Sequence, residues 1–64
     1  MQIKEARKRA GMTQLDLARS AGVTVAAICR YEKGIRTPSV KTAKKIGKVL
    51  SIPWFEVIDN KKAG

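Results

Sequence analysis

From Gln14 to Lys33 the chain reads QLDLARSAGVTVAAICRYEK, two short segments of helical character on either side of a glycine. Ala18 is placed where the first helix must approach the second closely, so a larger side chain would wedge them apart. Gly22 is placed where the chain reverses, at a backbone position expected to need a positive φ, which glycine adopts without steric cost. Ile28 is then the apolar residue that docks the second helix onto the first. These offsets predict a helix-turn-helix, and DNA binding is the leading hypothesis.

The charge of the chain favours a polyanionic partner. Its 64 residues carry 14 Lys and Arg against 5 Asp and Glu, for a formal net charge of +9. A chain of this length forms one small domain with a modest core. The excess of positive charge is typical of proteins that bind nucleic acid or an acidic membrane surface.

Other classes of protein are disfavoured by what the chain lacks. No apolar run approaches the ~20 residues of a transmembrane helix, and the N-terminal stretch MQIKEARKRAG has no apolar segment of a signal peptide, so we expect a cytoplasmic protein. With one cysteine, Cys29, and no histidine, we expect no internal disulfide, metal site or cofactor. The acidic residues are scattered among the bases and suggest no catalytic carboxylate pair, so we do not expect an enzyme.

The domain is predicted to be all-α, because helix starts and stops recur along the chain and no segment alternates as a half-buried strand would. The expected helices run over residues 3–10, from a capping box of Thr13 and Asp16 to Gly22, over 25–33 after Thr24, from Ser39 onward, and from near residue 53. Their inward positions are expected to be Ile3, Ala6, Arg7, Ala10, Leu17, Ala18, Ala21, Ala27, Ile28, Tyr31, Val40, Ala43, Ile46, Gly47, Leu50, Trp54, Val57 and Ile58.

The chain also resembles the Cro/C1-type helix-turn-helix family, the Xre-like regulators related to phage repressors. The resemblance covers almost the whole chain and is carried by RKRAGMTQLDLARSAGV, TVAAICRYEKGIRTPSV and AKKIGKVLSIPW. It implies a compact five-helix, lambda-repressor-like domain over residues 1–59, with residues 60–64 as a frayed tail. It further implies binding to operator DNA as a two-fold dimer, with the helix at 25–33 in the major groove. A bacterial or phage-encoded protein is the expected context.

Helical periodicity indicates which residues of the third helix face the DNA. With Ile28 and Tyr31 pointing to the core, the candidate base readers are Val25, Ala26, Cys29 and Arg30. Only Arg30 carries strong donors, and its planar fork can bind the O6 and N7 atoms of a guanine; a solvated or phosphate-bound arginine is the alternative. Val25 and Ala26 stand where relatives often carry polar residues, and they can contact thymine methyl groups.

Phosphate contacts are expected on both sides of these base readers. Free backbone N–H groups and the helix dipole favour an anion at the starts of the second and third helices, at Thr13, Gln14 and Thr24, and the resemblance places Gln14 on the DNA backbone. A second cluster follows the third helix and comprises Lys33, Arg36, Thr37, Ser39 and Lys41. The remaining lysines of the fourth helix are expected to form a solvated outer face.

Two further pairs are singled out. The resemblance implies an internal ion pair between Arg7 and Glu32, which would tie the first helix to the end of the third. Phe55 projects sideways from the inward face of the last helix, and with Ile52 it suggests a dimer interface, which the resemblance also implies for this region. The alternative is an aromatic ring folded onto its own core.

The sequence therefore predicts a sequence-specific transcriptional regulator that acts as a repressor. It is expected to bind a palindromic double-stranded operator as a homodimer. No small-molecule ligand and no membrane partner are expected. The alternatives are an autoregulating antitoxin of a toxin–antitoxin pair and a protein-interaction adaptor that does not bind DNA. A cationic membrane-surface peptide would not explain the helix-turn-helix spacing, and an RNA-binding module would need more exposed aromatic residues.

Overall fold

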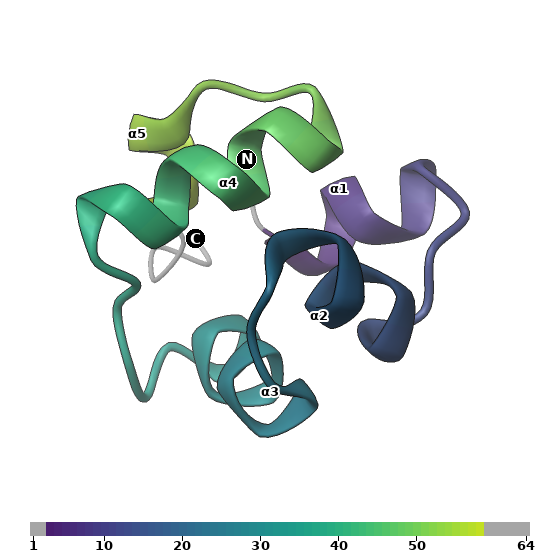
Figure 1. Ribbon diagram of the computed structural model, residues 1–64, viewed down its shortest axis with the longest axis horizontal. Helices are drawn as coiled ribbons and strands as arrows, with labels where there is room; N and C mark the ends of the chain where they lie inside the picture. The colour runs from purple at the N-terminus through teal and green to yellow at the C-terminus, as the bar shows by residue number, and fades with distance from the viewer. Residues whose placement is uncertain (1–2, 59–64) are drawn as a thin grey trace.

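Five helices make up the computed structural model, which describes residues 3–58: α1 (Ile3–Arg9), α2 (Gln14–Ala21), α3 (Val25–Lys33), α4 (Val40–Leu50) and α5 (Trp54–Ile58). No strand occurs among these residues, so the all-α prediction is confirmed. α2 contacts both α3 and α4, and α5 packs on α4. Figure 1 shows α3 at one end of the molecule and the α4–α5 pair at the other, and α1 contacts α3. None of the described helices is long and apolar enough to cross a membrane.

The predicted helix starts are present as hydrogen-bonded caps. The Thr13 hydroxyl accepts from the Asp16 backbone N–H at 3.0 Å, and the Thr13 N–H donates to the Asp16 carboxylate at 3.0 Å, which completes the capping box. The bond from the Thr13 backbone N–H also lowers the pKa of the Asp16 carboxyl. The hydroxyls of Thr24 and Ser39 accept from N–H groups three residues on, at 3.1 and 3.2 Å. Each cap satisfies a backbone donor that the helix would otherwise leave free.

The helix ends are set by residues in the left-handed region. Gly22 ends α2 with a φ of 70°, as the spacing predicts, and Gly34 ends α3 with a φ of 75°. Ser51 ends α4 with a φ of 60°, a conformation that side-chain-bearing residues seldom adopt, and no glycine marks this position in the sequence. The turn of the helix-turn-helix therefore has the geometry that its glycine predicts.

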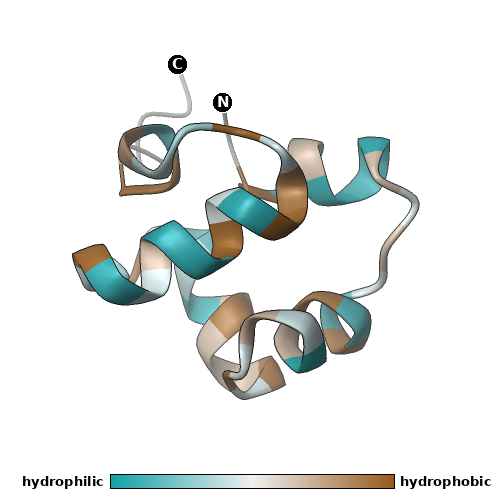
Figure 2. Ribbon diagram, turned by 45° about the horizontal axis from the view of Figure 1, so that its top comes forward, coloured by the Kyte–Doolittle hydropathy of each residue, from teal (hydrophilic) through white to brown (hydrophobic). Residues whose placement is uncertain are grey.

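Every helix contributes one completely buried large side chain to a single core. These five residues, one from each helix in chain order, are Ile3, Leu17, Ile28, Ile46 and Val57. Smaller residues such as Ala18 and Ala43 fill the spaces between them. In Figure 2 hydrophobic and hydrophilic bands both run along α4, as expected of a helix with one face on the core. Changing one of the four Ile or Leu residues among them to Ala would lower the free energy of unfolding by about 2 to 5 kcal/mol.

Gly47 permits the close packing of α4 against the chain that leads into α5. A Cβ atom at this position would lie 2.6 Å from the Ile52 carbonyl oxygen and 3.2 Å from the Trp54 backbone nitrogen. The Ile52 N–H donates to the Gly47 carbonyl at 2.9 Å, so the two segments are also bonded directly. The inward position expected for Gly47 is confirmed, and the atoms that approach it most closely belong to the backbone.

Three inward positions predicted from periodicity are wrong. Ala10 is exposed and follows the end of α1, because the chain turns away at Gly11. Val40 is 47% exposed, because it is the first residue of α4, whose beginning protrudes past the other helices (Figure 1). Trp54 is 38% exposed, because it begins the five-residue α5, in which Val57 takes the buried position. The expected domain end at residue 59 and the frayed tail at 60–64 lie outside the described residues.

Candidate nucleic-acid interface

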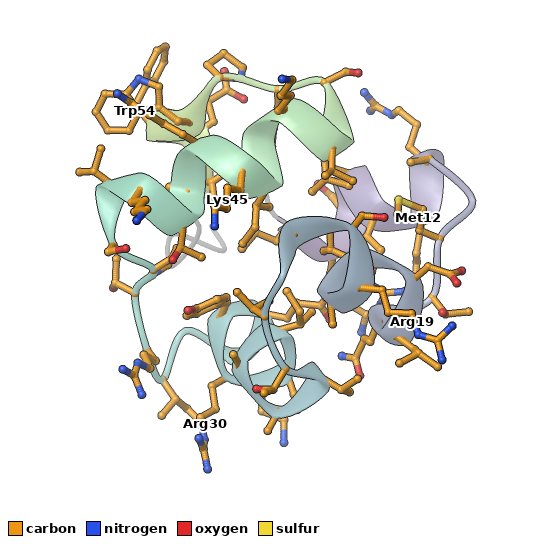
Figure 3. The ribbon with its side chains drawn as sticks, viewed as in Figure 1. Met12, Arg19, Arg30, Lys45 and Trp54 are labelled. Carbon is orange, nitrogen blue, oxygen red and sulfur yellow. The ribbon has the colours of Figure 1, made fainter. Side chains whose placement is uncertain are left out.

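The rotation of α3 about its own axis is fixed by its buried side. Ile28 and Tyr31 are both buried, as predicted from periodicity. The opposite side consequently exposes Ala26 and Arg30, and leaves Val25 38% exposed at the start of the helix. Figure 3 shows the Arg30 side chain extending from α3 away from the other helices, so its guanidinium is open to a partner.

Cys29 does not lie on the same open surface as Arg30. Its side chain is half-buried and lines a hollow together with Lys4 and Arg7 of α1. Glu32 and Lys33, one turn further along α3, line the same hollow. Of the four candidate base readers, Val25, Ala26 and Arg30 are thus exposed, and Cys29 is half-buried beside α1.

Glu32, near the end of α3, is the centre of a hydrogen-bonded network with α1 and α2. One carboxylate oxygen accepts from Arg7 Nε at 2.7 Å, and the other accepts from Arg7 Nη2 at 3.4 Å and from Gln14 Nε2 at 3.0 Å. Arg7 also donates through Nη1 to the Met12 carbonyl at 2.9 Å. The ion pair that the resemblance implies is therefore present, and both of its side chains are largely buried. The network joins α1, the α1–α2 turn, the start of α2 and the end of α3.

The Gln14 side chain has a partner within the domain. The resemblance implies that Gln14 contacts the DNA backbone; in the structure its side chain is half-buried and its amide donates to Glu32. The bond orients the amide and occupies one of its two N–H groups. Only the second N–H and the backbone N–H at the start of α2 remain to meet a phosphate.

The remaining phosphate candidates are all exposed. They are Thr13, Thr24, Lys33, Arg36, Thr37, Ser39 and Lys41. The loop after α3 is held against the helix end, because the N–H groups of Ile35 and Arg36 both donate to the Arg30 carbonyl, at 3.0 and 3.4 Å. Arg36 therefore has a defined starting direction before any partner binds.

Ile35 is a surface feature that the sequence analysis missed. It is 71% exposed, more than any other large hydrophobic residue among those described. It follows the α3 cap between two cationic positions, Lys33 and Arg36. The signal in the sequence was an apolar residue in the short loop between two helices. Helical periodicity says nothing about the exposure of a loop residue.

A second exposed surface lies far from Arg30, at the α4–α5 end of the molecule (Figure 3). The rings of Trp54 and Phe55 meet edge to face, with centroids 5.8 Å apart and an interplanar angle of 80°. The Lys44 ammonium lies 5.9 Å from the centroid of Trp54. Phe55 is 58% exposed, whereas Ile52 is half-buried against the core. We call Trp54, Phe55 and Lys44 the aromatic surface.

Comparison with known proteins identifies relatives for nearly all of this chain. A family model described as Helix-turn-helix matches residues 3–57. An uncharacterized HTH-type transcriptional regulator of Methanothermobacter thermautotrophicus is 44% identical over 56 residues, which are 88% of this chain and 81% of that protein. A putative HTH-type transcriptional regulatory protein of Methanocaldococcus jannaschii is 40% identical over 57 residues, and the match spans 89% of this chain but only 18% of that longer protein.

One solved structure has the same arrangement of helices. The N-terminal DNA binding domain of SinR from Bacillus subtilis superposes with a TM-score of 0.80 and 30% sequence identity. The match covers 94% of this chain and 88% of that domain. The five-helix, lambda-repressor-like fold expected from the sequence is therefore confirmed.

The Glu32 network leads to a test of stability. Glu32→Ala should lower the free energy of unfolding by about 2 to 4 kcal/mol, because the largely buried Arg7 guanidinium loses its counter-charge. In a double-mutant cycle with Arg7→Ala, the coupling energy should be about 1 to 3 kcal/mol. The coupling energy is obtained from urea unfolding curves of the parent, both single variants and the double variant. Lys45→Ala, an exposed change on α4, is the control and should leave the unfolding midpoint unchanged. Additive losses would show that the two side chains do not interact.

Proposed function

Because this chain belongs to the helix-turn-helix family of Cro/C1-type regulators, we propose that it binds double-stranded DNA sequence-specifically and regulates transcription. The observation that carries the proposal is the orientation of α3. Its inner side is fixed by Ile28 and Tyr31, so that Arg30 extends from a rigid helix into open space (Figure 3). A preset donor on a rigid helix is what recognition of base edges in the major groove requires.

The charges around α3 suit a phosphate backbone. Lys33 and Arg36 lie on either side of the α3 cap, and the loop between them is bonded to the Arg30 carbonyl. Thr13 and Thr24 open α2 and α3, where the positive ends of two helix dipoles attract phosphates. In this arrangement Arg30 enters the major groove while the flanking groups contact the strands that border it. The apolar side chain of Ile35 is then available to the deoxyribose carbons of the same strand.

The aromatic surface supports pairing of two copies on DNA. An exposed pair of aromatic rings is costly in water and gains from being covered. Its position at the α4–α5 end leaves α3 of each copy free to enter the groove (Figure 1). We place the centre of this two-fold contact at Phe55, with Ile52 at its edge. Occupation of an operator by such a dimer excludes competing proteins, so repression needs no further surface.

The experiment that tests the function is selection of bound sequences from a pool of random duplexes. A two-fold-symmetric motif should be enriched, with half-sites about one helical turn, ~34 Å, apart. If no sequence is enriched above the starting pool, the proposal fails and a role as a protein-interaction adaptor takes its place. An asymmetric motif would retain sequence-specific binding and contradict the two-fold dimer.

Arg30 should determine one base pair of each half-site. Arg30→Ala should cost about 1 to 3 kcal/mol on the selected site and relax the preference at a single position, because a bidentate contact to guanine is lost. Lys33→Ala and Arg36→Ala are the matched controls. Each should weaken selected and random duplexes alike and lower the salt slope of binding by about one unit, since each removes a phosphate contact. Equal losses on selected and random DNA for Arg30→Ala would remove it from base reading.

Phe55 should be required for cooperative binding to a full operator. In Phe55→Glu two carboxylates would meet across the two-fold axis, so affinity for a full site should fall to the level set by independent half-sites. The melting temperature should stay near that of the parent, because the ring is more than half exposed. Half-site and full-site titrations, with Lys48→Glu as a charge control on the outer face of α4, measure the effect. If Phe55→Glu unfolds the domain, Phe55 belongs to the core; if cooperativity persists, the dimer contact lies elsewhere.

A further inference from the structure

The open side of α3 is unusually poor in hydrogen-bonding groups. Ala26 is exposed there and Val25 is exposed at the start of the helix, and neither side chain has a donor or an acceptor. The Cys29 side chain is half-buried and lines the hollow between α3 and α1. Arg30 is therefore the one strong donor between the start of α3 and Lys33. A helix with this surface cannot read adenine or cytosine through polar side chains beside Arg30.

The apolar part of this surface lies next to Arg30. Ala26 precedes Arg30 by four residues, so the two side chains are neighbours on one face of α3. Four residues of helix correspond to about 6 Å of rise, or about two base-pair steps of ~3.4 Å each. Val25, one residue before Ala26, lies about 100° around the helix from it and is exposed because it begins α3, so the two apolar side chains share the N-terminal end of the helix. A base contacted by these side chains is thus within about two base pairs of the base contacted by Arg30.

The major-groove edge of DNA offers one apolar group, the C5-methyl group of thymine. The same group is present on 5-methylcytosine and absent from uracil and cytosine. Covering a methyl group with the side chains of Val25 and Ala26 removes apolar surface of both partners from water. At the usual free energy for burying one such carbon, the gain corresponds to about a fourfold increase in affinity per methyl group.

We propose that Val25 and Ala26 form a methyl-reading surface, so that the protein recognises a pyrimidine C5-methyl group within about two base pairs of the guanine bound by Arg30. The proposal rests on the DNA-binding function proposed above and adds the chemical feature that is read. It follows that 5-methylcytosine substitutes for thymine at this position. Methylation of cytosine in DNA would then create or strengthen sites for this protein.

The test compares bases that differ only by the methyl group. In a half-site duplex taken from the selection, each thymine near the Arg30-dependent base pair is replaced in turn by uracil, which keeps its pairing with adenine. At the most sensitive position, cytosine and 5-methylcytosine are then compared opposite guanine. Thymine should bind about fourfold more tightly than uracil, and 5-methylcytosine more tightly than cytosine by a similar factor. Half-sites keep the pairing of two copies out of the measurement.

Variants assign the effect to the two side chains. Val25→Ser and Ala26→Ser should reduce the thymine-to-uracil ratio toward one. Val40→Ser is the matched control, because Val40 is also an exposed valine at the first position of a helix, directly after a capping hydroxyl. It should retain the ratio of the parent. Circular dichroism of each variant checks that the helices are intact.

The outcomes separate this inference from the function on which it rests. If selection yields a motif but thymine and uracil duplexes bind equally at every position, the methyl-reading surface is refuted and sequence-specific binding stands. If both serine variants keep the ratio of the parent, the methyl group is read by other residues and the assignment to Val25 and Ala26 is refuted. If selection yields no motif, the proposed function itself fails.

Discussion

The contact between Glu32 and Arg7 is the constraint on which the arrangement of this domain depends. Glu32 lies near the end of α3, and Arg7 reaches it from α1 while also donating to the Met12 carbonyl in the turn before α2. A charge buried this far is costly without its partner, so the two helices are held in one relative position. The value of the pair is positional, because a buried ion pair often adds little to the net stability.

The consequence of that constraint appears on the far side of α3. With Ile28 in the core and Glu32 bonded to Arg7, α3 can neither rotate nor slide without losing both contacts. The side of α3 that carries Arg30 is thereby set before any partner arrives, as is the loop that its carbonyl anchors. A binding surface set in advance loses less conformational entropy on association than one that must be ordered.

The candidate site was only partly predictable from the sequence. The exposure of Ala26 and Arg30 followed from the 3.6-residue period once the buried side of α3 was assigned, whereas Val25 is exposed because it begins the helix. The half-buried position of Cys29 did not follow, because it depends on α1 packing alongside α3. The exposed Ile35 was missed as well, since a loop residue has no period from which its environment can be inferred.

Local chemistry alone was sufficient for the number of helices, their caps, the left-handed turn at Gly22 and most of the core. Each of these features depends on residues within about one helical turn of one another, and backbone hydrogen bonding dictates them. The packed structure was needed to show that Gln14 bonds to Glu32, and that Lys44 of α4 lies over the ring of Trp54 in α5. These contacts depend on where helices of unequal length meet, and periodicity within one helix contains no information about the position of another.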